Sequence, residues 1–203
     1  MWRPAYDTYP DQRQLVSWYR DGKPSVWSEP SSLWPKFRQV TNILLERCPP
    51  PAAVLDVGCF TGYFLRHLST LGYTGFGIDL QADLMRGLHE TCRYGGPLDF
   101  AFCAAENIAS VRPPASCDAI LALDVMEHAL DERRCLDAFD HVLRHGGCVC
   151  FHVPRYDDDA VEHVRSYADP DDAKRLGARW GVSELLECTD EHGRATWLIV
   201  AQK

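Results

Sequence analysis

Short apolar runs alternate with amphipathic segments through the middle of the chain. The apolar runs are typical of buried strands, and they cover residues 53–57, 75–79, 98–103, 119–123 and 148–153. Helical spacing of apolar residues predicts helices between them, over Gly62–Leu71, over Ala82–Cys92, and from a cap at Asp131 to Arg144, where Gly146-Gly147 ends the helix. Strands that alternate with helices predict a parallel sheet covered on both faces.

The two ends of the chain depart from this alternation. Residues 1–33 mix aromatic side chains with prolines and charges and have no clean period, which is typical of an arm or a lid. A helix is predicted over Trp34–Arg47, before a run of prolines. Near the other end, a helix is followed by two strand-like runs with a short connection, which joins antiparallel neighbours. These last elements are predicted over Pro170–Arg179, Val182–Cys188 and Ala195–Ala201.

Length and charge narrow the possible functions. A chain of 203 residues is the size of one domain, and we expect a single domain over residues 1–203 with its core at 34–203. The net charge of −8 makes a broad surface for nucleic acid unfavourable, although it leaves room for a local basic patch. The residues that could form such a patch are Arg133, Arg134, Arg144, Arg165, Lys174, Arg175 and Arg179.

Cysteine usage and hydropathy bear on the cellular compartment. The nine cysteines are scattered, odd in number and without a C-x-x-C pair, which favours reduced core thiols over disulfides or a zinc site. No apolar run approaches the roughly 20 residues of a membrane span, and the first residues do not resemble a signal peptide. We therefore expect a cytoplasmic protein without a membrane segment. The oligomeric state is not readable from the sequence.

The strongest chemical signal is a glycine turn after the first strand. The segment Val54–Gly62 places an acid, Asp56, and two glycines, Gly58 and Gly62, between an apolar strand and a helix. Glycines there let the backbone pass close to a ligand, although a tight turn without a ligand has the same pattern. A second acid, Asp79, ends the next strand about 20 residues on, where it can accept ribose hydroxyls of a nucleoside.

The residues of this turn favour a nucleoside that carries a positive charge over a dinucleotide that carries a pyrophosphate. A dinucleotide site of the form G-x-G-x-x-G receives a pyrophosphate, but here the middle glycine is missing between Gly58 and Gly62. The Asp56 carboxylate would repel a diphosphate and would suit a cationic sulfonium and an amino group. A nicotinamide dehydrogenase is therefore a remote alternative.

Five segments in their proper order resemble the successive motifs of class I S-adenosylmethionine-dependent methyltransferases. They read VLDVGCFTGYF, GFGIDL, AENI, CDAILALDVMEHALD and HVLRHGGCVCFHVP, and they span about residues 50–155. The closing helix and two strands also resemble that family's ending, in which the last strand is inserted antiparallel. The resemblance implies an α/β, Rossmann-like, doubly wound sheet of seven strands, mostly parallel with one antiparallel C-terminal strand.

The resemblance also implies roles for individual residues. Around the methionine part of the cofactor it places Asp56, Gly58, Cys59 and Gly62, and near the transferred methyl group Leu123. It places Asp79 at the ribose, and Leu80, Ala105 and Glu106 at the adenine. Many members of the family have an Asp where this chain has Ala104, so the adenine contacts depart from the usual pattern.

The segment Asp124–His128, after the fourth strand, leaves three alternatives open for the chemistry. Glu127 and His128 could be structural, or His128 could be the catalytic base for a hydroxyl acceptor. The third alternative is a divalent metal, because Asp124, Glu127 and His128 have the spacing of one helical face. This spacing resembles E-x-x-E-H of ubiquinone-biosynthesis O-methyltransferases and small-RNA 2′-O-methyltransferases, with His163 as a further candidate ligand; Asp124 is shorter than Glu, so a metal is not favoured.

We therefore predict methyl transfer from S-adenosylmethionine to oxygen or nitrogen of a small-molecule acceptor. The alternatives are a metal-dependent RNA 2′-O-methyltransferase, although nucleic acid is an unfavoured partner, and a non-catalytic methyltransferase-like binding protein. The intact set of Asp56, Gly58, Gly62 and Asp79 argues against the non-catalytic alternative. The acceptor itself is not readable from the sequence.

Overall fold

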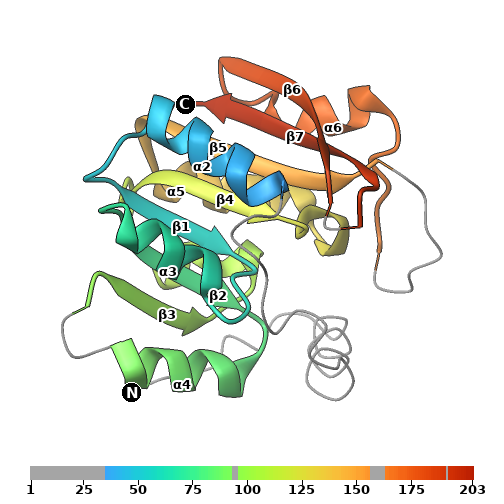
Figure 1. Ribbon diagram of the computed structural model, residues 1–203. Coiled ribbons are helices and arrows are strands. Elements are labelled where there is room, and N and C mark those ends of the chain that lie inside the picture. The colour runs from blue at the N-terminus through green and yellow to red at the C-terminus, as the bar shows by residue number, and fades with distance from the viewer. Residues whose placement is uncertain (1–34, 93–95, 156–162, 191) are drawn as a thin grey trace.

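The computed structural model describes residues 35–92, 96–155, 163–190 and 192–203. The expected N-terminal arm or lid, residues 1–33, lies outside them. The described residues form a seven-stranded sheet in the order β3-β2-β1-β4-β5-β7-β6 (Figure 1). The strands are β1 (Ala53–Val57), β2 (Thr74–Asp79), β3 (Leu98–Phe102), β4 (Cys117–Leu123), β5 (Leu143–Pro154), β6 (Val182–Thr189) and β7 (Ala195–Gln202).

The sheet has the expected mixture of strand directions. The first five strands pair in parallel, and β7 runs antiparallel to both β5 and β6. The predicted Rossmann-like sheet with one antiparallel strand is therefore confirmed.

Helices cover both faces of this sheet, each over its own apolar core. One core lies under α2 (Pro35–Arg47), α3 (Tyr63–Thr70) and α4 (Ala82–Cys92). The other lies under α5 (Glu132–Val142), α6 (Pro170–Gly177) and a 3₁₀ segment, η2 (Ala105–Ser110). Figure 1 shows α2 and α3 in front of the strands and α5 and α6 behind them. The central strands are buried on both faces between these helices, which explains why their sequences read as continuous apolar runs.

The strand order reverses between β1 and β4. From β1 the chain extends outward through β2 and β3, whereas β4 begins the other half of the sheet. Ligands of doubly wound sheets bind where the order reverses in this way. The loops after β1 and β4 touch there, since a Cβ added to Gly58 would lie 2.6 Å from Cγ2 of Val125.

One predicted boundary is wrong, at the start of β5. The helix was expected to reach Arg144 and to end at the glycine pair, but α5 ends at Val142 and Leu143 is already extended. The register between β4 and β5 shifts between Cys117 and Ala119, and Gly146 has φ of 81°. The glycines therefore form an irregularity inside a strand, which their freedom of φ allows, and do not end the helix.

The cysteines agree with the prediction of reduced core thiols. All nine cysteines are free thiols, and seven of them are buried, as expected for small core residues. Among the helices that the structure describes, none is both long enough and apolar enough to span a membrane.

Candidate active site

The turn after β1 is shaped by three residues with positive φ. These are Gly58 at 71°, Phe60 at 45° and Gly62 at 66°. The amides of Gly58 and Cys59 both donate to the carbonyl oxygen of Ile78, at 2.9 and 3.0 Å. The turn is therefore held to the end of β2, and the N–H groups of Gly58 and Cys59 are already engaged.

The side chain of Asp79 also holds this turn in place through hydrogen bonds. Its Oδ2 accepts from the amide of Phe60 at 2.9 Å, and its Oδ1 accepts from the amide of Gln81 at 3.0 Å. Burial raises the pKa of this half-buried carboxyl, although the backbone hydrogen bonds oppose the shift. The two amide contacts fix the orientation of the carboxylate beside the turn. Nothing in the sequence pointed to Phe60, because a non-glycine residue with positive φ leaves no compositional signal.

Asp56 is a buried acid next to the same turn. Only 5% of the residue is exposed. Burial raises the pKa of Asp56 to about 8, and the negative charge of Asp79 adds to the shift. A carboxyl group with this pKa loses its proton readily when a cation arrives beside it. Asp56 is therefore suited to a positively charged group of a ligand. When no such group is bound, ionisation of Asp56 lowers the stability of the fold.

The residues assigned to the adenine and methyl positions lie along the same edge. Leu80 follows β2 and is half-buried against the core under α4, and Leu123 ends β4. Ala105 and Glu106 begin η2, the segment that follows β3. The amide of Asp131 donates to Oε1 of Glu106 at 3.5 Å, which is a long and weak hydrogen bond.

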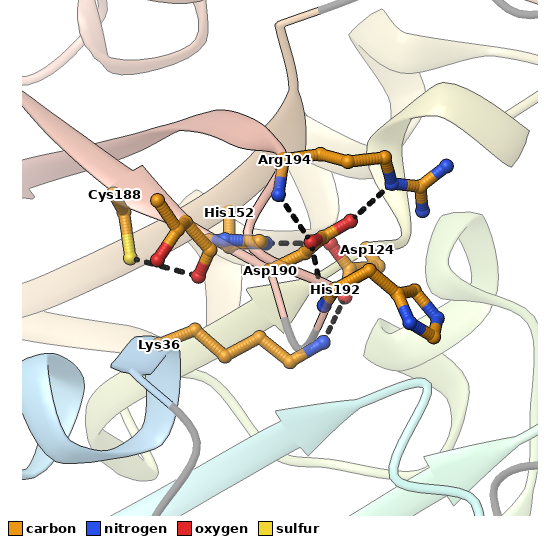
Figure 2. Close-up of polar contacts among 8 residues, drawn as sticks. Lys36, Asp124, His152, Cys188, Asp190, His192 and Arg194 are labelled. Carbon is orange, nitrogen blue, oxygen red and sulfur yellow. Dashed lines mark hydrogen bonds and ion pairs between the residues drawn. The ribbon is translucent and has the colours of Figure 1, made fainter.

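The expected helical face of Asp124, Glu127 and His128 does not form. Only Met126–His128 is helical, as the 3₁₀ segment η3, and Asp124 precedes it with φ of 57°. The Asp124 carboxylate turns instead toward β5 and α2. Its Oδ1 is 2.5 Å from Nδ1 of His152, and its Oδ2 accepts from Nζ of Lys36 (Figure 2).

Charge stabilises the triad of Lys36, Asp124 and His152, in which the lysine and the histidine are buried and the Asp124 side chain is partly exposed. Burial opposes ionisation of Asp124, but the charges and hydrogen bonds of His152 and Lys36 outweigh it and hold the pKa well below its usual range. Burial likewise opposes protonation of His152, yet Asp124 raises its pKa to about 9. No sequence pattern points to this triad, because Lys36 and His152 are separated from Asp124 by 88 and 28 positions.

The other three candidate metal ligands do come together. Glu127, His128 and His163 can offer ligand atoms that all lie within 4.8 Å of one another. The amide of Val164 donates to the carbonyl of Glu127 at 2.8 Å, which brings the segment after β5 onto η3. Glu127 is 2% exposed and its Oε2 has no hydrogen-bond partner. Burial, followed by the charge of Asp124, raises the pKa of Glu127 to about 8.

The comparison with known families decides where this chain belongs. A family model described as "Methyltransferase domain" matches residues 33–196, most of the chain. The chain belongs to the methyltransferase domain family. The resemblance to class I S-adenosylmethionine-dependent methyltransferases, inferred from five motifs, is thereby confirmed.

Individual relatives match a part of their own length. A ubiquinone biosynthesis O-methyltransferase of Paraburkholderia phymatum is 28% identical over 132 residues, which are 62% of this chain and 56% of that protein. A protein-L-isoaspartate O-methyltransferase of Chlorobium limicola is 35% identical over 95 residues, which are 42% of this chain and 44% of that protein. The chain spans about half the length of the curated relatives it matches.

A solved structure shares the fold over nearly the whole chain. It is a 1,6-didemethyltoxoflavin-N1-methyltransferase of Burkholderia thailandensis, with 1,6-didemethyltoxoflavin and S-adenosylhomocysteine bound. The TM-score is 0.73 at 20% identity, over 99% of this chain and 93% of that one. At this identity the likeness shows the fold alone.

Proposed function

We propose that this protein transfers a methyl group from S-adenosylmethionine to an oxygen or nitrogen atom of a small molecule. The observation that carries the proposal is the buried Asp56 beside a turn whose amides are engaged. A pyrophosphate needs free N–H groups, but those of Gly58 and Cys59 donate to Ile78. A buried carboxylate beside these engaged amides is suited to a cation, such as a sulfonium or an α-amino group.

The residues at this edge fit the cofactor in separate roles. Asp56 would face its positive charge, with Gly58, Cys59 and Gly62 forming the wall of the turn. Asp79 would accept the ribose hydroxyls, while Leu80, Ala105 and Glu106 would border the adenine. The cofactor supplies a methyl group on a sulfonium, and its displacement releases a neutral thioether, so the protein needs no acid for the leaving group. The protein's contribution is alignment, with His128 as the base if the acceptor is a hydroxyl.

A transfer assay tests this proposal. S-adenosylmethionine with a radiolabelled methyl group would be incubated with the purified protein and a pool of small metabolites, and separately with RNA. We expect label in small molecules, with one S-adenosylhomocysteine released for each methyl transferred. Label that enters RNA alone would favour the nucleic acid alternative.

The charges of the described surface favour a small molecule over RNA. Most of the basic side chains that could form a local patch are held by acidic neighbours, and a paired cation offers little to a phosphate. The ion pairs are Arg133–Asp137, Arg144–Asp118, Lys174–Asp171, Arg175–Asp172 and Arg179–Asp137.

Replacing Asp79 tests the ribose assignment. We expect Asp79→Ala to weaken binding of S-adenosylhomocysteine by about 1–3 kcal/mol, because charge-assisted hydrogen bonds to the ribose are lost. Calorimetric titration measures the effect. Asp99→Ala, which removes an exposed acid from the neighbouring strand β3, is the matched control and should leave affinity unchanged. Equal affinities for the two folded variants would show that Asp79 does not hold the ribose.

A second candidate is metal-assisted transfer at Glu127, His128 and His163. The observation that favours it is the buried, unpartnered Oε2 of Glu127 beside two imidazoles. One carboxylate and two imidazoles form a donor set for a divalent transition ion, which would lower the pKa of a hydroxyl acceptor.

We expect activity to survive a chelator, because Asp124, the acid that would complete this set, is taken up by Lys36 and His152. His163→Ala should then change the turnover less than about twofold. Activity that disappears with EDTA, returns with Mn²⁺, and fails to return in His163→Ala would establish the metal-assisted reaction instead.

A further inference from the structure

Three buried polar side chains share one face of the sheet near the carboxyl end of β5. His152 lies on β5, Thr196 on β7 and Cys188 on β6. Thr196 pairs with both Pro154 and Cys188 in the register, and Pro154 is two residues from His152. Side chains two positions apart point to the same face, so the three are neighbours on it. This is the face that α2 covers, and we call the three side chains the β5-end polar group.

The polar atoms of this group lack adequate partners. His152 is fully buried and Thr196 is 2% exposed, yet neither Nε2 of His152 nor Oγ1 of Thr196 makes a hydrogen bond. The Sγ of Cys188 donates only weakly, to the adjacent carbonyl of Thr189 at 3.6 Å. The ring of His152 lies between Cys188 and Asp124 (Figure 2), and the thiol of Cys188 is near enough to help raise the pKa of His152, although its position gives Nε2 no hydrogen bond of acceptable geometry. Buried polar atoms in native proteins nearly always have partners, so two orphaned atoms on adjacent strands of one face point to a partner that the described side chains do not supply.

The charge next to the group indicates what kind of occupant fits. Lys36 and His152 both contact the single carboxylate of Asp124. The raised pKa of His152, about 9, makes its ring an imidazolium near neutral pH, with N–H groups on both nitrogens. The Asp124 side chain is 32% exposed, but both cations are buried, so two buried cations share one carboxylate and an anion would balance the excess charge.

A structural role for the triad explains only part of these observations. Ion pairing through Asp124 anchors the first turn of α2 to β5, and this accounts for Lys36 and for Nδ1 of His152. It does not account for Nε2 of His152, nor for the hydroxyl of Thr196. Both of the unexplained atoms can donate hydrogen bonds, as an anionic oxygen ligand requires.

The site of methyl transfer adjoins this group. Asp124 is followed directly by Val125, which packs on Gly58 of the cofactor turn. We propose that the β5-end polar group binds a carboxylate carried by the methyl acceptor, an inference that rests on the proposed function. His152 Nε2 and Thr196 Oγ1 donate to the carboxylate oxygens, and the excess charge of Lys36 and His152 balances it. The acceptor is therefore a small carboxylic acid.

Binding of acetate and of its neutral counterpart acetamide tests this assignment without knowledge of the acceptor. Both probes would be titrated into protein saturated with S-adenosylhomocysteine, at constant ionic strength in chloride, while NMR follows the imidazole of His152. We expect acetate to bind about tenfold more tightly than acetamide, because hydrogen bonds to a charged group are stronger. His152→Gln identifies the resonance and should abolish the preference. His89→Gln removes an exposed imidazole that pairs with Asp99, and should preserve it.

Thr196→Val separates a binding role from a structural one. Removal of an orphaned hydroxyl should leave the thermal midpoint equal or higher, whereas acetate should bind about fivefold more weakly. Equal binding of acetate and acetamide by the wild type, or an unchanged affinity for acetate in Thr196→Val, would overturn the inference. Saturation with S-adenosylhomocysteine is measured first, so failure at that step counts against the proposed function and failure at the acetate step counts against the carboxylate site alone.

Discussion

Asp56→Asn is expected to stabilise the fold and at the same time to weaken cofactor binding. The folded protein raises the pKa of Asp56 to about 8, so it holds the proton more tightly than the unfolded chain, in which a carboxyl titrates near 4. The stability from this group is therefore complete below about pH 4 and is lost as the pH rises toward about 8. Asparagine is neutral at every pH, so it should add about 1–3 kcal/mol to the free energy of unfolding near pH 8.

Urea denaturation from pH 5 to pH 9 measures the stability effect of Asp56→Asn. The wild type should lose stability relative to the variant as the pH rises, while the exposed control Asp99→Asn should follow the wild type. Affinity of Asp56→Asn for S-adenosylmethionine should fall about 10–100-fold, because the charge opposite the cation is lost. A variant that is no more stable at pH 8, or that binds the cofactor normally, would contradict the role given to Asp56.

Gly62→Ala is expected to reduce stability by about 2–4 kcal/mol. Gly62 has φ of 66°, and a Cβ would lie 2.6 Å from two carbons of the Phe100 ring. Left-handed strain alone costs roughly 1 kcal/mol, and overpacking of a core adds about 1–3 kcal/mol. The ring of Phe100 is buried between strand and turn, so it has little room to move.

Gly146→Ala separates the two contributions in this experiment. Gly146 has φ of 81°, but no atom lies within 4 Å of its added Cβ, so only the backbone strain applies. Chemical denaturation should show a loss of about 1 kcal/mol for Gly146→Ala and a clearly larger loss for Gly62→Ala. Equal losses would mean that Phe100 does not close off the turn.

The apolar runs predicted the fold well because local pattern and global burial agree there. The runs near β1, β2 and β4 are apolar because helices cover both faces of a central strand. The glycine pair at Gly146 could not be placed with the same rule, since glycine ends a helix and also relaxes a strand irregularity. Pairing with β4 decided between the two, and pairing is a long-range contact that a local pattern does not contain.

The sequence predicted that Asp56 and Asp79 lie near each other, but not the direction in which the Asp124 side chain points. Asp56 and Asp79 stand at strand ends, and strand ends share an edge, so their proximity followed from topology. The direction of Asp124 did not follow, because residue spacing assumes an α-helix and the backbone there is left-handed. Lys36 and His152 were missed for the same reason as most tertiary ion pairs: their partner lies far away in the sequence.

Calorimetric titration with S-adenosylhomocysteine tests the central claim most directly. We expect saturable heat with one site per chain, and little or no heat from a nicotinamide dinucleotide, because the amides of Gly58, Cys59 and Phe60 beside Asp56 are already engaged and the Asp56 carboxylate repels a diphosphate. Clear binding of the dinucleotide, with no heat from either S-adenosylhomocysteine or S-adenosylmethionine, would contradict it.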